Sequence, residues 1–206
     1  QMASIQQING DYYGSKETLT EALPYVKDDI NYRTAIANFF GIAHKELSIY
    51  DDAVFYYKQA IKNAKDTLAK QAPLNNIAVV YIQQNKNDQA IQILEAILEN
   101  KIQSKLLPTS KARIFDNLGF AYFKKGDLIK SLSLMNTGLE MRNQAVDLYG
   151  SIESNLHLAE YHSKTNTEKS VQHAEQAYKL SSKFNSIDER LKALSFLISN
   201  DFGFKT

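Results

Sequence analysis

The stretch from Pro108 to Gly138 reads PTSKARIFDNLGFAYFKKGDLIKSLSLMNTG, and it decides the fold. Within it, the small residue Gly119 is followed three positions later by the aromatic Tyr122, and twelve positions later by another small residue that opens a second apolar stripe. Apolar residues recur at helical spacing on both sides of Gly126, which can adopt the left-handed conformation that ends a helix. The stretch therefore predicts two helices joined by a tight turn.

Three other stretches repeat this pattern of small and aromatic positions. A helix pair of this size cannot bury its apolar face alone, so it must stack on its neighbours. The repetition predicts an all-α chain of stacked antiparallel helix pairs, with about four full repeats and a partial unit at each end. The other copies are Gly41 with Ala53, Tyr57 and Ala60; Ala78 with Tyr81, Ala90, Leu94 and Ile97; and Leu158 with Tyr161, Ser170, Ala174 and Ala177.

The composition agrees with a helical fold and excludes several functions. Hydrophobic residues make up 44% of the 206 positions, and only eight Gly and three Pro are present, which is too little punctuation for a many-stranded sheet. The 24 basic and 23 acidic residues are interspersed, and most aromatic residues fall at core positions of the repeat. Nucleic-acid binding by this segment is therefore not expected. The absence of cysteine rules out disulfides and thiolate metal sites.

Membrane insertion by this segment is not expected either. No apolar run approaches the roughly 18 residues that a bilayer span requires, and the first ten residues lack the charged and apolar regions of a signal peptide. The first residue is Gln1 rather than Met, which leaves a removed leader open. The sequence is compatible with a cytoplasmic or a periplasmic location.

The repeated residues resemble the tetratricopeptide repeat family. The family pattern places Leu and Gly side by side, an aromatic residue three positions on, Ala twelve after the Gly, then an aromatic and another Ala. Leu118, Gly119 and Tyr122 match it, whereas His44 stands where the first aromatic of an earlier unit belongs. The resemblance covers nearly the whole chain and implies a right-handed α-solenoid. The third unit departs from the pattern at Ser131, Met135 and Gly138.

The repeat grid predicts one continuous domain over residues 1–206. The units are expected at 1–28 (partial), 29–65, 66–104, 108–143, 145–184 and 186–206 (partial), with the first read as the second half of an earlier repeat. The spacing between units exceeds the 34 residues of the basic repeat, so longer helices or turns are expected. Pro73 either begins the first helix of its unit or kinks a longer one that Asp66 and Thr67 would cap. The register of the fourth unit is open between Leu158 and Ala159.

The sequence contains no recognisable catalytic constellation. The phosphate-binding patterns GxxxxGK[ST] and GxGxxG and the nucleophile pattern GxSxG are all absent. His157 and His162 are five residues apart, so they do not share a helix face as a metal-binding pair at four residues would. We therefore expect no enzyme activity, no cofactor and no metal site.

The resemblance implies a concave groove lined by the first helix of each pair. Asparagine recurs near one grid position, at Asn38, Asn75 and Asn155. An amide both donates and accepts hydrogen bonds, so a file of amides suits an extended peptide backbone, although bonds to neighbouring helices are the alternative. A clamp for a peptide carboxylate is not expected, because the basic residues belong to different units. The predicted groove residues are Asn38, Ile42, Lys45, Asn75, Val79, Ile82, Arg113, Asp116, Asn117, Phe120, Lys124 and Asn155.

These observations favour a scaffold that binds a protein or peptide ligand. The stretch from Ala174 to Asn200 also resembles the region where repeat arrays of Bacteroidetes-type membrane signalling regulators continue toward a transmembrane helix and a kinase or helix-turn-helix module. This gives an alternative function, a ligand-sensing extracytoplasmic region in which binding alters array curvature or the formation of a homodimer.

Overall fold

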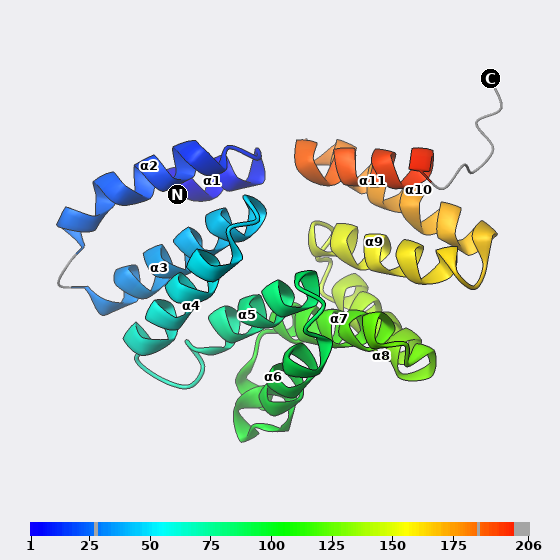
Figure 1. Cartoon of the computed structure of the whole chain (residues 1–206), viewed down its shortest axis with the longest axis horizontal. Coiled ribbons are helices and arrows are strands. Elements are labelled where there is room, and N and C mark those ends of the chain that lie inside the picture. Colours follow the sequence, from blue (N-terminus) through cyan, green and yellow to red (C-terminus); the bar gives the residue numbers. More distant parts are fainter. Residues whose placement is uncertain (27–28, 185, 200–206) are drawn as a thin grey trace. The chain divides into compact units, whose positions relative to one another are not determined.

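The computed structural model describes residues 1–26, 29–184 and 186–199. Within these residues the chain forms eleven α-helices and two short 3-10 helices and contains no strand (Figure 1). The all-α prediction is confirmed. The chain divides into two compact units, Gln1–Leu106 and Leu107–Thr206. The single continuous domain expected from the sequence stays a prediction.

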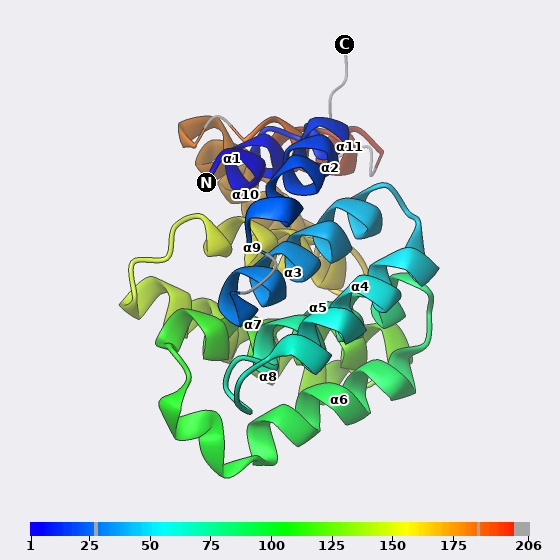
Figure 2. The same ribbon diagram turned by 90° about the vertical axis from the view of Figure 1, so that its left-hand side faces the viewer.

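Unit 1 contains three helix pairs, and Figure 2 shows α3 and α4 side by side. The Asp29 carboxylate begins α3 by accepting hydrogen bonds from the backbone amides of Asn31 (2.8 Å) and Tyr32 (3.2 Å). The helices of this unit are α1 (Met2–Ile8), α2 (Tyr12–Ala22), η1 (Leu23–Tyr25), α3 (Ile30–Glu46), α4 (Tyr50–Asn63), α5 (Gln71–Gln83), α6 (Asn87–Glu99) and η2 (Lys101–Lys105).

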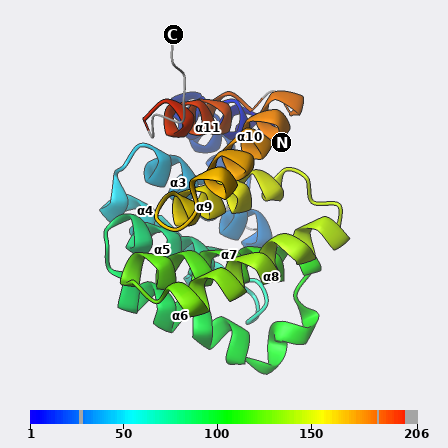
Figure 3. The ribbon, with the colours of Figure 1, turned by 90° about the vertical axis from the view of Figure 1, so that its right-hand side faces the viewer.

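Unit 2 contains two long helix pairs and a further helix, seen from the side in Figure 3. The predicted turn at Gly126 is confirmed, because this glycine ends α7 with a φ angle of 98°. The Asp127 carboxylate then begins α8 by accepting a hydrogen bond from the Lys130 amide at 3.1 Å. The helices are α7 (Pro108–Lys125), α8 (Leu128–Gln144), α9 (Gly150–Ser163), α10 (Thr167–Lys183) and α11 (Ile187–Ser199).

The small residues of the repeat lie where paired helices cross closely. A Cβ atom on Gly41 would lie 2.4 Å from the buried ring of Tyr57 on α4. A Cβ atom on Gly119 would lie 2.8 Å from the backbone nitrogen of Met135 on α8. In unit 2 the core then continues from one pair to the next, because Met135 packs with Phe123, Leu158 and others between α7, α8 and α9.

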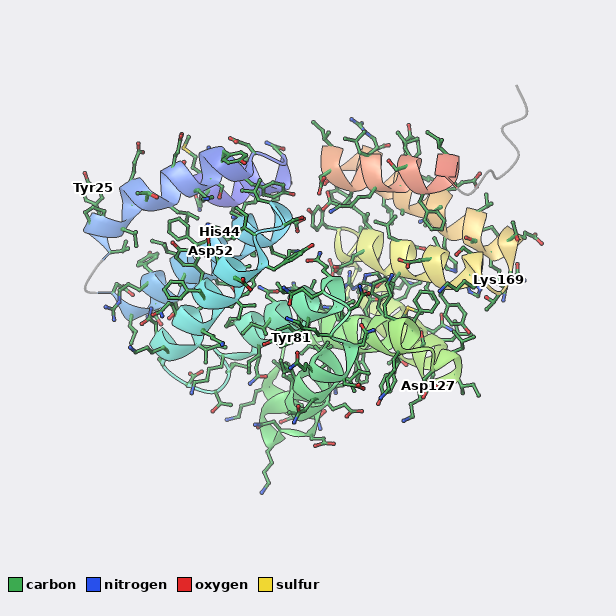
Figure 4. All side chains as sticks on the ribbon, in the orientation of Figure 1. Tyr25, His44, Asp52, Tyr81, Asp127 and Lys169 are labelled. Carbon is green, nitrogen blue, oxygen red and sulfur yellow. The ribbon has the colours of Figure 1, made fainter. Side chains whose placement is uncertain are left out.

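Two departures from the family pattern have a structural reason. His44 fills its aromatic position as a ring would, since it packs against Tyr56 with ring centres 5.0 Å apart, and its Nε2 lies 3.9 Å from Asp52 (Figure 4). In the fourth unit, Ala159 occupies the crossing point, where its carbonyl accepts a hydrogen bond from Ser170 Oγ at 2.7 Å. Ala159, and not Leu158, is therefore the small residue of the fourth unit.

The structure decides two points that the sequence left open or placed differently. In the first unit a short helix, α1, precedes α2 and packs with it, and the partial repeat over residues 1–28 stays a prediction. Pro73 is the third residue of α5, in the first turn, where a missing backbone amide hydrogen costs nothing. The Asp66 carboxylate caps a turn through the Ala69 amide at 2.8 Å instead of beginning a long helix.

Candidate binding surfaces

A cavity of about 220 Å³ lies in unit 1 between α3 and the start of α5. Its floor is apolar, because four of its residues are alanine or proline, and its remaining side chains are two amides, a hydroxyl and an ammonium. No acidic residue lines it. The lining residues are Asn31, Thr34, Ala35 and Asn38 from α3, Lys65 and Ala69 from the α4–α5 loop, and Ala72 and Pro73 from α5.

Two donors of this cavity are available to a ligand. Asn38 Oδ1 accepts a hydrogen bond from Asn76 Nδ2 at 3.0 Å, which orients the amide and leaves the Nδ2 hydrogens of Asn38 as donors. No ion-pair partner of the Lys65 ammonium is found in the described part of the chain, and Lys65 is an exposed residue of the α4–α5 loop. The cavity therefore favours a ligand group that accepts hydrogen bonds or carries negative charge.

A second surface lies in unit 2, where one stripe of α7 packs along α9. Phe120 stacks on His157 with ring centres 3.9 Å apart and an angle of 11° between the planes. One turn further along α7, Lys124 Nζ lies 2.6 Å from Glu160 Oε1 and 5.1 Å from the centre of the Phe120 ring. These four residues form a partly exposed aromatic and charged patch, named here the α7–α9 patch.

A buried charge cluster supports the α7–α9 patch from below. Asp116 Oδ2 lies 3.1 Å from His157 Nδ1 and 3.6 Å from Arg142 Nη2, which also lies 3.5 Å from Glu153 Oε2. The side chains of Asp116 and Arg142 are 0% and 1% exposed. Burial is the largest influence on the pKa of His157 and lowers it, but the charge and hydrogen bond of Asp116, helped by Glu153, outweigh burial and raise this pKa.

The other two histidines of unit 2 face each other across α9 and α10. The rings of His162 and His173 are parallel to within 2°, with centres 5.6 Å apart. Burial lowers the pKa of His162, and the positive charge of Lys169 lowers it further (Figure 4 labels Lys169 at the start of α10). Burial also lowers the pKa of His173, followed by His162 and Lys169. Both imidazoles are therefore neutral at neutral pH.

This pair predicts that acid weakens the fold of unit 2. Because the folded pKa of each ring lies below the ordinary value of about 6.5, the unfolded chain binds protons more readily, and stability that is present above pH 6.5 is lost as the pH falls through the folded pKa. We expect the double variant His162→Gln, His173→Gln to lose less unfolding free energy than the parent between pH 7.5 and pH 5, measured by urea titration.

Replacing His157 should change the pH dependence of the unfolding free energy in the opposite direction. Its raised pKa contributes stability below pH 6.5 that is lost as the pH rises through the folded value, so His157→Gln steepens the loss on acidification. Equal slopes for the parent and the double variant would contradict the assignment to His162 and His173.

The structure places the twelve predicted groove residues in three groups by exposure. Arg113 and Lys124 are exposed, and five others are partly exposed. Asp116, Phe120 and Lys124 are brought together on α7, because Asp116 and Phe120 both contact His157 and Lys124 Nζ lies 5.1 Å from the centre of the Phe120 ring. Contact with a ligand stays a prediction for all twelve. The partly exposed residues are Asn38, Ile42, Lys45, Val79 and Phe120, and the buried ones are Asn75, Ile82, Asp116, Asn117 and Asn155.

Buried amides alter the interpretation of the asparagine file. Asn155 Nδ2 donates to the Ser151 carbonyl at 2.7 Å, and its Oδ1 accepts from His173 Nδ1 at 2.9 Å, so both ends of the amide have internal partners. Asn75 is 3% exposed. Asn155 therefore bonds to neighbouring helical residues, which was the alternative interpretation. Of Asn38, Asn75 and Asn155, only Asn38 lines the cavity.

Nine residues of the two surfaces, seven from the cavity and two from the α7–α9 patch, were missing from the predicted groove, and four of them are informative. Asn31 precedes Asn38 by seven residues, or two helical turns. The two amides therefore lie on the same face of α3, and helical periodicity alone could have predicted this. His157 and Glu160 lie on the first helix of the fourth unit. Because the register of that unit was open between Leu158 and Ala159, the sequence did not predict which face of the helix carries these two residues. Lys65 lies in a loop, and no repeat position indicates its approach to α3.

Residues 1–26, 29–184 and 186–199 contain neither a group of metal-ligating side chains nor a membrane-spanning helix. No three or more His, Cys, Asp or Glu side chains gather as metal ligands within these ranges. None of their helices has both the length and the apolarity that crossing a membrane requires.

Comparison with known proteins agrees with the helix pairs described above. A family model described as "Tetratricopeptide repeat" matches residues 73–101, which span most of α5 and all of α6. Residues 73–101 of the chain therefore form a tetratricopeptide repeat. A curated relative, "Tetratricopeptide repeat protein 30 homolog" of Caenorhabditis elegans, is 25% identical over 139 residues. These are 63% of this chain but only 21% of that relative.

Solved structures share the fold of this chain. BtubC (BKLC) from P. vanneervenii has a TM-score of 0.63 at 18% identity and covers 89% of this chain and 78% of its own. A putative kinesin light chain of Podosopora anserina with nearly identical TPR-like repeats has a TM-score of 0.58 at 18% identity, covering 89% and 93%. The fold supports a role in protein interaction generally. The resemblance to Bacteroidetes-type regulators stays a hypothesis.

Proposed function

We propose that this chain binds an extended peptide segment of another protein along its first helices, without catalysis. The cavity of unit 1 carries this proposal. It is the place where an apolar floor and available hydrogen-bond donors meet on the first helices of two repeats.

The cavity has the size and chemistry of a pocket for one side chain of a peptide. Its volume of about 220 Å³ lies below the roughly 300 to 1,000 Å³ of sites for whole small ligands. Ala35, Ala72 and Pro73 supply apolar contacts, while Asn38 Nδ2 can donate to a backbone carbonyl beside the inserted side chain. A peptide bound in this way has its polar backbone paired and one apolar side chain buried.

The charge of the residues that line the cavity indicates which charge a peptide ligand should carry. Lys65 lines the cavity, and no carboxylate lies among the lining residues. A peptide with an acidic residue next to its inserted side chain is therefore favoured over a basic one. The available donors and the Lys65 ammonium both match acceptor groups.

The α7–α9 patch offers unit 2 a contact surface of the same kind. The stacked rings of Phe120 and His157 lie beside the ion pair of Lys124 and Glu160, so aromatic and charged groups are next to each other on this surface. Aromatic centres with a polar rim are typical of interaction surfaces. We propose this patch as a second place where a partner protein docks.

A filled cavity tests the proposal. Peptides selected by display against the full chain would be measured by fluorescence polarisation on the parent and on Ala72→Phe, whose ring occupies the cavity. We expect at least a tenfold loss of affinity, about 1.4 kcal/mol, because the inserted side chain is displaced.

The matched control is Ala96→Phe, which adds the same ring at an exposed position of α6 outside the cavity. It should bind within about twofold of the parent, since it leaves the cavity open. Unchanged binding of every selected peptide to Ala72→Phe would remove the cavity from the proposed function.

A further inference from the structure

The helix α11 of unit 2 is apolar on two opposite faces. It lies beside α10 (Figure 3), where Ala193 packs with Ile152 and Ala177, and Leu197 packs with Ala159. The opposite face is also apolar, but it is exposed. A surface helix normally turns a polar face to water, whereas a helix that is apolar all round is normally covered on every side.

The exposed face carries four aliphatic side chains in one line, named here the α11 stripe. Ile187, Leu191 and Ile198 are 44%, 55% and 70% exposed, and Leu194 is partly exposed. Steps of four, three and four residues separate them, which places all four on one side of the helix. Ala193 lies about half a turn away from Leu191, so the α11 stripe is opposite the buried face.

The α11 stripe is complementary to itself. Its spacing of four, three and four residues is the same in both directions, with Ile at both ends and Leu in the middle. Two copies of α11 placed antiparallel therefore bring Ile187 of each opposite Ile198 of the other, and Leu191 opposite Leu194. This is the contact that a two-fold axis produces, because each residue meets its counterpart twice.

The charges of α11 permit self-association and favour the antiparallel direction. Asp188, Glu189, Arg190 and Lys192 sum to zero, and Lys192 Nζ is already paired with Asp188 Oδ2 of its own helix at 2.7 Å. A parallel pair would place each charge beside its own copy. In the antiparallel pair, the two Asp188 residues are about 13 Å apart along the axis, and the helix dipoles oppose each other.

We propose that the α11 stripe binds the α11 stripe of a second copy of this chain, in an antiparallel pair about a two-fold axis. The driving force is the removal of aliphatic surface from water. Two stripes of four side chains bury less than the roughly 1,200 Å² at which stable interfaces begin, so the pair is weak and reversible. This interface uses neither the cavity of unit 1 nor the α7–α9 patch, and it does not depend on peptide binding.

Analytical ultracentrifugation of the full chain at concentrations up to about 500 µM tests the pairing. We expect a reversible monomer–dimer equilibrium with a dissociation constant above about 1 µM. Leu191→Glu should weaken it at least tenfold, because it buries an unpaired charge against leucine. A parent chain that stays monomeric at the highest concentration would overturn the proposal.

The matched control is Ile129→Glu, which makes the same exchange on α8, at a side chain that is 88% exposed. It should keep the parental equilibrium, since it leaves the α11 stripe unchanged. Equal weakening by Ile129→Glu and Leu191→Glu would assign the loss to net charge and would contradict the assignment to α11.

Cross-linking tests the direction of the pair, because the chain has no cysteine of its own. In the antiparallel pair, two copies of Ile187→Cys hold their sulfurs about 16 Å apart along the axis, too far for a disulfide. The same holds for Ile198→Cys. Mild oxidation of an equimolar mixture, with one variant isotopically labelled, should give disulfide dimers that contain one copy of each. Disulfide dimers of Ile187→Cys alone would overturn the antiparallel pairing.

Discussion

Replacing Gly119 with alanine lowers the unfolding free energy of this protein by about 2 to 3 kcal/mol. The added Cβ would lie 2.8 Å from the backbone nitrogen of Met135 and 2.9 Å from the backbone oxygen of Ser131, and backbone atoms of a packed helix cannot move aside. Alanine is intrinsically the better helix former by about 1 kcal/mol, so the contact and the propensity act in opposite directions. Urea unfolding followed by circular dichroism measures which is larger.

Arg113→Ala is the control for this substitution, because Arg113 is exposed on the same helix. Its unfolding free energy should stay within about 0.5 kcal/mol of the parent. A Gly119→Ala variant as stable as the parent would mean that α7 and α8 do not cross as closely as described.

The second large effect is expected from Arg142→Met, which should cost about 3 to 5 kcal/mol. Arg142 and Asp116 are 1% and 0% exposed, so removing the guanidinium leaves a buried carboxylate with His157 as its remaining charged partner. Burying a charge without compensation is costly, whereas the pair as a whole is not necessarily stabilising. The same urea titration gives the value.

A double variant separates the lost charge balance from lost packing. Arg142→Met combined with Asp116→Asn should lose less stability than Arg142→Met alone, because the uncompensated carboxylate is gone. Lys124→Met removes the cation of the half-exposed pair with Glu160 and should cost less than about 1 kcal/mol. A double variant that is less stable than the single one would assign the effect of Arg142 to packing.

The repeat pattern predicted the helix pairs because each of its positions has a local reason. Gly126 ends α7 since it lacks a Cβ atom, and Asp127 begins α8 through its carboxylate. Such signals act over a few residues and can be read from one stretch. The same reasoning did not predict the short helix α1, which has few residues and no side-chain cap.

The candidate surfaces were predicted only in part. Asp116, Phe120 and Lys124, which the resemblance implied as groove residues, lie at intervals of four residues on α7, and Asp116 and Phe120 both contact His157. Their burial was not predictable, because it depends on the helices that cover them. Asp116 is closed in by Arg142 and His157 from two other helices, while Lys124 stays exposed.

The sequence by itself determined the all-α class, the pairing of helices and the small residues at their crossings, since these follow from periodicity within one or two helices. Only the tertiary structure decided which polar side chains meet. Lys65 and Asn31 line one cavity, and His162 faces His173, because separate segments are brought together by packing. The distance between two side chains on different helices depends on the crossing of those helices, and no spacing along the chain records it.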